Sequence, residues 1–398
     1  MKLKNGKAIL PLLVLMLTSN PAFGQRAAKP PDDAYVSKQL ESQLLAIADE
    51  AVTTQLQILV SGDLDGSLKN KKLARLYRVA MMDRFKFQVY TGSKLKETRQ
   101  DYKDFKTRLE VKAASKRGNK VTLKITETTE LKLDVPGGPP FYAYVDTHLF
   151  DFVYEGNEWS LVKDTIFQPK PSAINTAEKL SPAQLQMIPL KDAPPGYRPG
   201  KMQASLAANS GAFLVKASLA PAAWPIGFNR TAAVDYATAH ALSPNPAYYT
   251  FSNDCTNFVS QCMYTGGWQM VGFGAGFGRA DPNNWYYSCI SSFGQPVASY
   301  SWGGAYNFNV FILNAGRVDG VPYYTDLQPG DIIACDWDTL NGPHQPDGRI
   351  DHWVIITGKD TDGNVYVSYH SNNRLNKPMT QLRLVDEPGA NFYGDRIR

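Results

Sequence analysis

A cysteine and a histidine in the C-terminal part of the chain have the chemistry of a nucleophile and its base. Cys255 follows Asp254, a favoured helix N-cap, at the start of a segment with helical apolar periodicity. Backbone N–H groups and the dipole of a first helical turn favour an anion, which predicts a lowered thiol pKa and donors for an oxyanion. His352 lies in the apolar run 350–358, which predicts a strand presenting the imidazole at a sheet edge. The pair indicates covalent acyl chemistry, although a lone Cys or His is more often a core residue.

A third polar group must orient the imidazole of His352. His370 ends the next predicted strand, and two further candidates, Asn372 and Asn373, lie just beyond it. The turn at 360–364 predicts an antiparallel hairpin whose paired residue numbers sum to about 724, which places Asn372 opposite His352. Residues 370 and 372 share one face of a strand, so alternation leaves both as candidates.

The elements that must position these residues fall into two groups. In the first group, helical periodicity over 34–60 and 69–82 precedes strand patterns at 109–114, 120–133, 141–154 and 159–167, which predicts an α+β unit with helices on one face of a meander sheet. Its last strand resembles the closing strand of cone-shaped nuclear-transport-factor-like or cystatin-like domains. In the second group, we expect helices over 231–241 and from 255 to 266, and strands over 331–337, 350–358 and 365–370.

Composition shifts along the chain predict four segments. Lysines at 2, 4 and 7, the apolar run 8–17 and Ala22-Phe23-Gly24 predict a cleaved signal peptide over 1–24 rather than an uncleaved anchor. An accessory domain over 25–167 follows, then a linker rich in Pro and Ala over 168–225, and the Cys–His domain over 226–398. We therefore expect a secreted or periplasmic protein without stable membrane insertion, because no later run reaches about 18 apolar residues.

The charge pattern argues against nucleic acid as a partner. The net charge of +5 falls to +2 when the three signal-peptide lysines are removed. Residues 226–398 carry 10 Lys and Arg against 15 Asp and Glu, a net of −5, so residues 25–225 carry +7. The basic N-terminal half is a candidate for contact with an anionic envelope surface, and a solvated basic face is the alternative.

The remaining cysteines predict no disulfide framework. Cys262 lies seven residues after Cys255, a helical rise of ~10 Å that a disulfide cannot span. One bridge among Cys262, Cys289 and Cys335 stays open at this point.

Several segments after residue 229 resemble, in order, the bacterial "putative amidase domain" family, which is similar to NlpC-type and CHAP-type papain-fold cysteine peptidases. The resemblance covers roughly 229–375 and is carried by Asn229–Ala237, Asp254–Cys262, Gly266–Trp268, Ser301–Trp302, Leu327–Ile333 and Asp351–Val354. It implies a papain-like α+β domain with a helix-borne nucleophile Cys255, the base His352, and His370 as the orienting residue in preference to Asn372. It also implies that Asp254 binds a substrate amine. Family members carry Ser or a similar small residue after the His, so Trp353 departs from the family pattern and is expected to narrow a subsite. Trp302 is a candidate for the cleft lining, although core packing is the more common use of such an aromatic residue. Papain-like chemistry needs no metal or cofactor.

These features predict a secreted cysteine amidohydrolase that cleaves a peptide or amide bond, with cell-wall peptidoglycan as the expected substrate. An acyltransferase would share the same acyl-enzyme, so the sequence does not separate transfer from hydrolysis. A wall-binding module without catalysis is the other alternative, and the presence of both Cys255 and His352 argues against it. The glycine-rich stretch 272–278 is a candidate lid loop.

Overall fold

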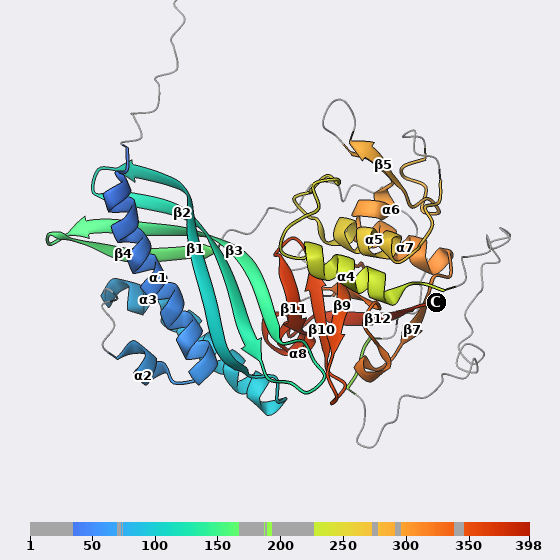
Figure 1. Ribbon diagram of the computed structural model, residues 1–398, viewed down its shortest axis with the longest axis horizontal. Coiled ribbons are helices and arrows are strands. Elements are labelled where there is room, and N and C mark those ends of the chain that lie inside the picture. Colours follow the sequence, from blue (N-terminus) through green and yellow to red (C-terminus); the bar gives the residue numbers. More distant parts are fainter. Residues whose placement is uncertain are drawn as a thin grey trace, which may run out of the picture.

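The computed structural model describes residues 35–69, 73, 75–166, 187, 189–192, 227–272, 278–290, 296–337 and 346–398. The expected signal peptide, most of the expected linker and the centre of the glycine-rich stretch lie outside these residues. The chain is mixed α+β and is built around a large antiparallel sheet (Figure 1).

Three helices cover one face of four long strands in the N-terminal part, as expected from the change of periodicity (Figure 1). The elements are α1 (Lys38–Ser61), α2 (Leu64–Leu68), α3 (Arg75–Glu97), β1 (Tyr102–Arg117), β2 (Lys120–Leu133), β3 (Phe141–Glu155) and β4 (Glu158–Ile166). The predicted bounds of β2 are reproduced. The second long helix instead begins at Arg75 and runs to Glu97, well beyond the predicted 69–82.

Helix α1 begins and ends where its local chemistry predicts. The hydroxyl of Ser37 accepts a hydrogen bond from the Leu40 amide at its start, and Gly62 closes it in the left-handed conformation at φ +73°. Among the described helices it is the one long and apolar enough to cross a membrane by length and composition, and 50% of its most apolar stretch is buried. Leu44, Ala48 and Ala51 are fully buried against the sheet, as in the core helix of a globular domain.

The C-terminal part places helices on the continuation of the same sheet. Its helices are α4 (Arg230–His240), α5 (Cys255–Thr265), α6 (Tyr300–Gly303), α7 (Ala305–Asn314), α8 (Met379–Gln381) and the short helical turns η3 (Tyr324–Asp326) and η4 (Leu382–Asp386). Its strands are β7 (Val318–Val321), β8 (Ile332–Asp336), β9 (His352–Lys359), β10 (Val365–Tyr369), β11 (Arg374–Pro378) and β12 (Asn391–Ile397), with β5 (Tyr287–Ile290) and β6 (Pro296–Ala298) as a separate pair.

One ten-stranded sheet runs through both parts in the order β1-β2-β3-β11-β10-β9-β8-β12-β7, with β4 also paired to β3. The join is the antiparallel pairing of β3 with β11, where the Val145 amide donates to the Asn373 carbonyl over 3.1 Å. Tyr366 of β10 is buried in the N-terminal hydrophobic cluster, and Ala143 of β3 in the C-terminal one. The two parts therefore share one hydrogen-bonded ladder, and each contributes a buried residue to the hydrophobic cluster of the other.

Part of the expected linker packs onto the C-terminal part. The Leu190 amide donates to the Phe392 carbonyl over 2.7 Å, and Lys191 bridges Tyr323. Leu190 is itself buried in the cluster formed by β8, β9 and β10. This piece of the 168–225 segment is thus ordered against the sheet.

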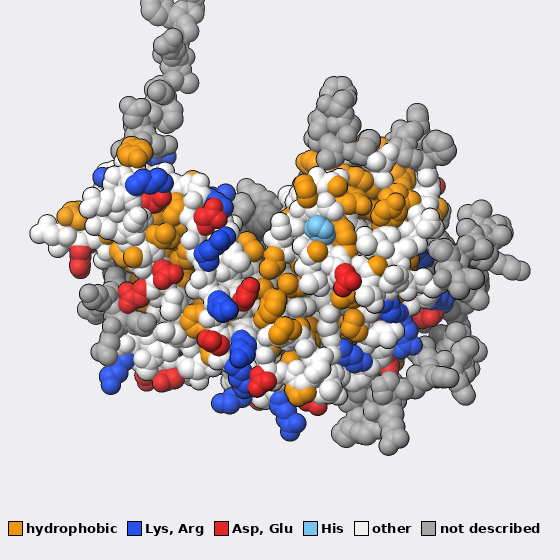
Figure 2. All heavy atoms as spheres, viewed as in Figure 1, with side chains coloured by type: hydrophobic (Ala, Val, Ile, Leu, Met, Phe, Trp, Pro, Cys, Tyr) orange, Lys and Arg blue, Asp and Glu red, His pale blue; other side chains and the backbone are white. Residues whose placement is uncertain are grey.

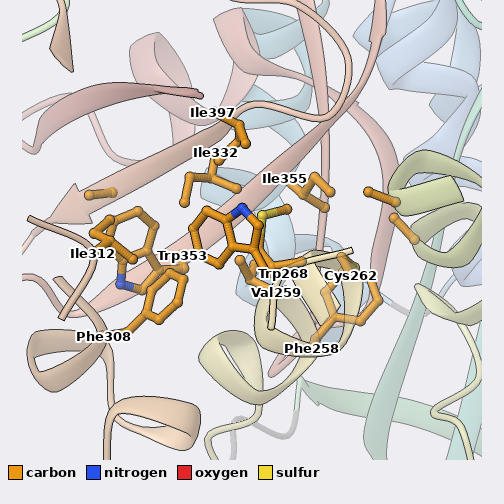
Figure 3. Packing of buried hydrophobic residues seen from close by; sticks show 14 of the residues in the cluster. Phe258, Val259, Cys262, Trp268, Phe308, Ile312, Ile332, Trp353, Ile355 and Ile397 are labelled. Carbon is orange, nitrogen blue, oxygen red and sulfur yellow. The ribbon is translucent and has the colours of Figure 1, made fainter. Parts of the chain in front are cut away.

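Helix α5 lies at the centre of the C-terminal part. Every residue from Cys255 to Met263 is buried, because β9 and β10 cover one side of the helix and α4, α6 and α7 the others. Figure 3 shows Phe258, Val259 and Cys262 of this helix packed with aromatic and aliphatic side chains from α7, β8 and β9. This tight packing fixes the position of the first turn, where Cys255 lies.

Candidate active site

The thiol of Cys255 lies in the first turn of α5 and is nearly buried, with the residue 5% exposed. The backbone N–H of Trp353 is a hydrogen-bond donor to the sulfur, and Sγ lies 3.6 Å from Oγ1 of Thr256. Burial raises the pKa of the Cys255 thiol above its ordinary value, and these two contacts only partly oppose it. The expectation of a lowered thiol pKa is therefore wrong: desolvation outweighs the helix terminus, and the resting form is the thiol.

His352 opens β9, where it pairs with Cys335 of β8. Its ring stacks on Trp337 with centroids 4.8 Å apart and meets the edge of Tyr369 at 5.0 Å. Burial, with the nearby charge of Lys377, lowers the pKa of His352 to about 3, so the imidazole is neutral at physiological pH. Its Nε2 is buried and has no hydrogen-bond partner among the described residues.

The backbone of β9 reaches Cys255 one residue after His352, because the amide that contacts the thiol belongs to Trp353. Within the described part of the chain the sulfur and the imidazole form no direct hydrogen bond. Catalytic hydrogen bonds are often long without substrate and tighten in the Michaelis complex. The thiol is protonated and the imidazole is neutral, which are the starting states for general-base activation of a nucleophile.

His370 lies beside Asp254, whereas we expected it to orient His352. Its Nδ1 is 2.6 Å from Oδ2 of Asp254, and its Nε2 is 2.8 Å from the His240 carbonyl. The ring also stacks on Phe258, with centroids 4.1 Å apart. Both ring nitrogens are thus engaged, and neither is available to the imidazole of His352. His370 instead ties α4 and the start of α5 to the end of β10.

The carboxylate of Asp254 is buried, has partners within the fold at both oxygens and does not line the cleft, so it is not placed to bind the expected substrate amine. Oδ1 accepts from the Phe251 amide and from Nδ2 of Asn257, at 2.8 Å each, and Oδ2 binds His370. Asp254 precedes α5 as predicted, but its side chain makes no capping bond. The first-turn N–H groups of α5 are therefore not covered by this carboxylate and can face an oxyanion.

Trp302 and Trp353 lie in the hydrophobic core, so the substrate contacts expected of them are not made. Both side chains are fully buried. The indole of Trp302 donates to Oδ1 of Asn257 over 2.8 Å, and that of Trp353 donates to the Ala305 carbonyl over 2.9 Å. Alternation explains Trp353: it follows His352 on a strand, and its side chain therefore points to the opposite face, against α7.

Ser371 is a site residue that the sequence interpretation missed. It lies between the two candidates His370 and Asn372, and its Oγ accepts from the Asp254 amide over 2.9 Å. Its φ of +81° is in the left-handed region, which non-glycine residues rarely occupy and which is often found at functional sites. The sequence gives no direct signal for this conformation.

The register of the hairpin follows the prediction at first and then shifts. Val365 pairs with Lys359 and Tyr366 with Gly358, as the predicted sum of about 724 requires. An irregularity at Thr357 then shifts the pairing by one, so that Val367 pairs with Ile356. The last pair of the two strands is Ser368 with Ile355, so the ladder ends before His352 and before residues 370–372.

A cleft of about 530 Å³ adjoins the candidate site. On its C-terminal side it is lined by His352, Tyr369, Ser371 and Asn372, of which Asn372 is exposed. Its other side is formed by α1, α3, β2 and β3 of the N-terminal part. Ser371 of this lining accepts a hydrogen bond from the amide of Asp254, the residue before α5.

The cysteines of the described core are reduced. Cys255, Cys262 and Cys335 are buried free thiols. Of the disulfides that the sequence left open, the one between Cys262 and Cys335 is therefore not formed. Burial raises the pKa of Cys262 and Cys335 well above the ordinary value, which makes them unreactive core residues.

One comparison with known proteins concerns the C-terminal part. Residues 227–393 match the family model described as "Putative amidase domain", which supports an amidase-domain family for this region. The match agrees with the family resemblance of the sequence motifs that follow residue 229.

Two curated proteins of Bacillus subtilis (strain 168) are similar to the chain. The uncharacterized protein YhbB is 35% identical over 139 residues, covering 33% of this chain and 38% of that protein. The uncharacterized protein YjcM is 34% identical over 176 residues, covering 43% and 37%. The chain thus spans under two fifths of the length of these relatives. The crystal structure of the Kfla4162 protein from Kribbella flavida aligns with 32% of this chain and 90% of its own, at 11% identity and a TM-score of 0.22, which is too low to carry an argument.

Proposed function

We propose that the region 227–393 hydrolyses an amide bond through a covalent thioester, with Cys255 as the nucleophile and His352 as the general base. One observation carries the proposal: a thiol at the uncapped start of a buried helix receives the backbone N–H of the residue that follows a neutral histidine. The match to an amidase-domain family supports the same bond type.

The reaction follows from the protonation states at rest. His352 takes the thiol proton as Sγ of Cys255 attacks the carbonyl carbon, and the oxyanion faces the first-turn N–H groups of α5. The C–N bond breaks while the imidazolium returns its proton to the leaving amine, which leaves a thioester. His352 then deprotonates a water that attacks the thioester, and the products are a carboxylic acid and the restored thiol.

The residues around the pair have supporting roles in this proposal. His370 is a positioning residue that holds the start of α5 through Asp254. Asn372 is the candidate that orients His352, because both side chains line the same cleft and Nε2 of His352 lacks a described partner. The site is then a Cys-His-Asn triad, whereas the family resemblance favoured a second histidine.

We further propose a papain-like enzyme, similar to NlpC-type and CHAP-type peptidases, that is secreted or periplasmic and cleaves peptides of the wall polymer peptidoglycan. The expected signal peptide supports the location, and the motif around Cys255 supports the substrate class. The N-terminal part, with helices on one face of a curved meander, is consistent with a cone-like accessory domain. On the face drawn in Figure 2, acidic and basic side chains are interspersed without a large area of one sign, which gives little support to envelope contact through a basic surface there.

Mass spectrometry of peptidoglycan fragments tests this function. We expect the mature protein to release fragments that each gain one water across one amide bond. Cys255→Ala should lower the rate by at least ~10³-fold. The matched control is Cys262→Ala, a second buried cysteine on α5, which should keep activity within a few-fold. Full activity in Cys255→Ala would exclude the thioester route, and products in which an added amine replaces water would favour the acyltransferase alternative.

A further inference from the structure

The cleft beside His352 continues deep into the N-terminal part, between the helices α1 and α3 and the inner face of β2 and β3. We propose that this N-terminal wall is a substrate subsite of the enzyme, which binds a peptide segment bearing both a free ammonium and a free carboxylate group. The inference rests on the proposed hydrolase and names which part of the chain recognises its substrate.

The charges that line the cleft are balanced. The cationic side chains are Arg84, His148, Arg374 and Lys377, and the anionic ones are Glu127, Asp146, Asp386 and Glu387. A polyanionic ligand would meet as many carboxylates as cations, whereas a ligand with both signs can find complementary partners. The lining therefore fits a zwitterionic peptide better than an anionic glycan or lipid surface.

His148 is counted among the cationic side chains because two carboxylates stabilise its protonated imidazole. Its Nδ1 lies 2.7 Å from Oδ1 of Asp164 and its Nε2 lies 2.8 Å from Oε2 of Glu127. Burial lowers the pKa of this imidazole, but the two carboxylates outweigh burial and raise it to about 10.

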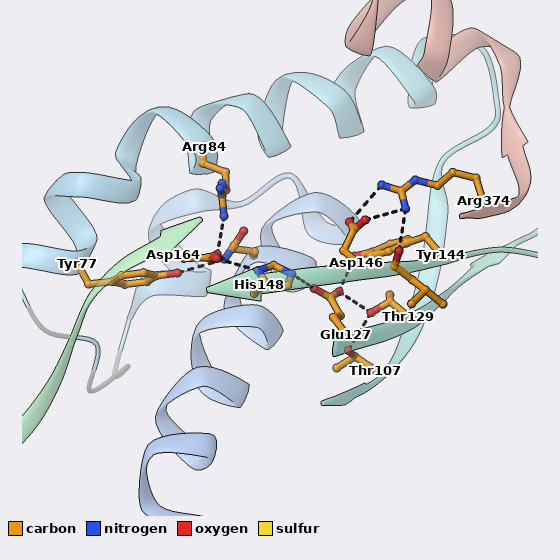
Figure 4. A network of polar contacts seen from close by, with 12 residues as sticks. Tyr77, Arg84, Thr107, Glu127, Thr129, Tyr144, Asp146, His148, Asp164 and Arg374 are labelled. Carbon is orange, nitrogen blue, oxygen red and sulfur yellow. Dashed lines mark hydrogen bonds and ion pairs between the residues drawn. The ribbon is translucent and has the colours of Figure 1, made fainter. Parts of the chain in front are cut away.

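These residues form a fixed wall rather than a set of free side chains (Figure 4). Arg84 of α3 contacts Asp164 at 2.5 Å, and Oε1 of Glu127 accepts from the Tyr144 hydroxyl over 2.7 Å. The guanidinium of Arg374 lies over the Tyr144 ring, 5.1 Å from its centroid. Contacts therefore run from α3 to β11, and such preorganisation lowers the cost of ordering a site when a ligand binds.

The join between the two parts fixes the distance from this wall to the reacting residues. Arg374 of β11 binds Asp146 of β3, with Nη1 2.8 Å from Oδ1, beside the backbone ladder of the same two strands. Strand β11 is also paired with β10, whose end lies beside His352. A peptide in the N-terminal wall would thus be held in a fixed register with the candidate nucleophile.

An open polar atom and an exposed aromatic ring mark where the ligand would bind. Within the described residues, Nε of Arg374 is buried without a hydrogen-bond partner, and its side chain lines the cleft. Phe87 and Gln88 of α3 line its rim, and Phe87 is 44% exposed although most large apolar side chains of this part are buried. An exposed ring at a cleft rim provides apolar contact area for a bound chain.

Binding to the full mature chain carrying Cys255→Ala tests the subsite without turnover. The probes are a wall-stem peptide with one free ammonium and one free carboxylate, and the same peptide with both groups blocked. We expect calorimetry to show that the charged peptide binds at least ~10-fold more tightly than the blocked one. Phe87→Ala should weaken that binding by ~10-fold, and Gln88→Ala serves as a second rim variant if the first fails to fold.

The matched control is Val79→Ala, because Val79 is 69% exposed on the same helix and lies outside the cleft lining. It should leave the affinity within about 2-fold. Equal effects of the Phe87 and Val79 variants, or equal binding of the two peptides, would overturn the subsite.

Hydrolysis of a small activated ester tests the thiol chemistry without a ligand that fills the cleft. It therefore distinguishes failure of the subsite proposal from failure of the hydrolase proposal. If ester turnover needs Cys255 but Phe87→Ala leaves peptide affinity unchanged, the subsite is refuted and the hydrolase proposal stands. Peptide binding that depends on Phe87, without any ester turnover, would support the subsite and refute the hydrolase.

Discussion

His370 and Asp254 are joined by a 2.6 Å contact that ties the end of β10 to the residue before the candidate nucleophile. Removing the imidazole with His370→Ala would leave a buried carboxylate with one partner fewer, at a cost of about 1–3 kcal/mol in the free energy of unfolding. We expect a lower Tm and about 10-fold lower kcat. The pH dependence of kcat/KM should keep its shape, because His370 moves no proton in the reaction.

The variant Asn372→Ala, compared with His370→Ala, tests which residue orients His352. Asn372 is exposed in the cleft, so its loss should leave Tm nearly unchanged while kcat falls by ~10–100-fold through misorientation of His352. Nearly intact turnover in Asn372→Ala, with a changed pH profile in His370→Ala, would restore the Cys-His-His assignment.

The alkylation of Cys255 should follow its raised pKa. Because burial disfavours the thiolate, the rate with iodoacetamide should rise by about 10-fold per pH unit between pH 7 and 9 without a plateau. Mass spectrometry of tryptic peptides measures it, with Cys262 and Cys335 as internal controls that stay unmodified in the folded protein. A plateau near neutral pH would instead indicate a preformed thiolate–imidazolium pair.

The local part of the site could be predicted from sequence, and the long-range part could not. A cysteine after an N-cap residue and a histidine opening an apolar strand are short patterns, and both elements form as predicted. The hairpin turn also predicted the first pairs of β9 and β10. The irregularity at Thr357 has no clear sequence signal, yet it shifts the register of the two strands by one residue.

The corrections share a physical cause, which is tertiary burial. Trp302 and Trp353 are large apolar side chains, and their type alone does not distinguish a cleft from a core. The pKa of Cys255 depends on how completely β9 covers the helix start, which the helix pattern alone does not show. The pairing of β3 with β11 joins residues more than 200 positions apart, beyond the reach of periodicity.

That pairing predicts how the protein responds to limited proteolysis. Cuts are expected within the segment 168–225, whose Pro- and Ala-rich sequence predicts a linker. The two pieces should nevertheless stay together on gel filtration, because β3 and β11 remain hydrogen-bonded and Arg374 binds Asp146. Arg374→Ala should weaken the association of the nicked pieces and leave the uncut chain folded. Immediate separation of nicked wild-type pieces would show that the shared ladder is too weak to hold them.

The last prediction concerns a buried carboxylate away from the site. Asp395 of β12 is buried, and none of the described residues donates a hydrogen bond to its side chain. Burial, with the negative charge of Asp331, raises the pKa of Asp395 to about 7 from an ordinary value of 3.8. Between these two values the folded state binds more protons than the unfolded state, so this group makes stability fall as pH rises from 3.8 through 7.

Asp395→Asn removes that ionisation without changing the size of the side chain. Its Tm should exceed that of the wild type by ~3 °C or more at pH 8, and the difference should shrink at pH 5, where Asp395 is protonated in the folded protein. Asp235→Asn, an exposed carboxylate on α4, is the control and should shift Tm by less than ~1 °C at either pH. A Tm difference for Asp395→Asn that is the same at pH 5 and pH 8 would show that Asp395 does not titrate in this range, and that burial does not hold its proton.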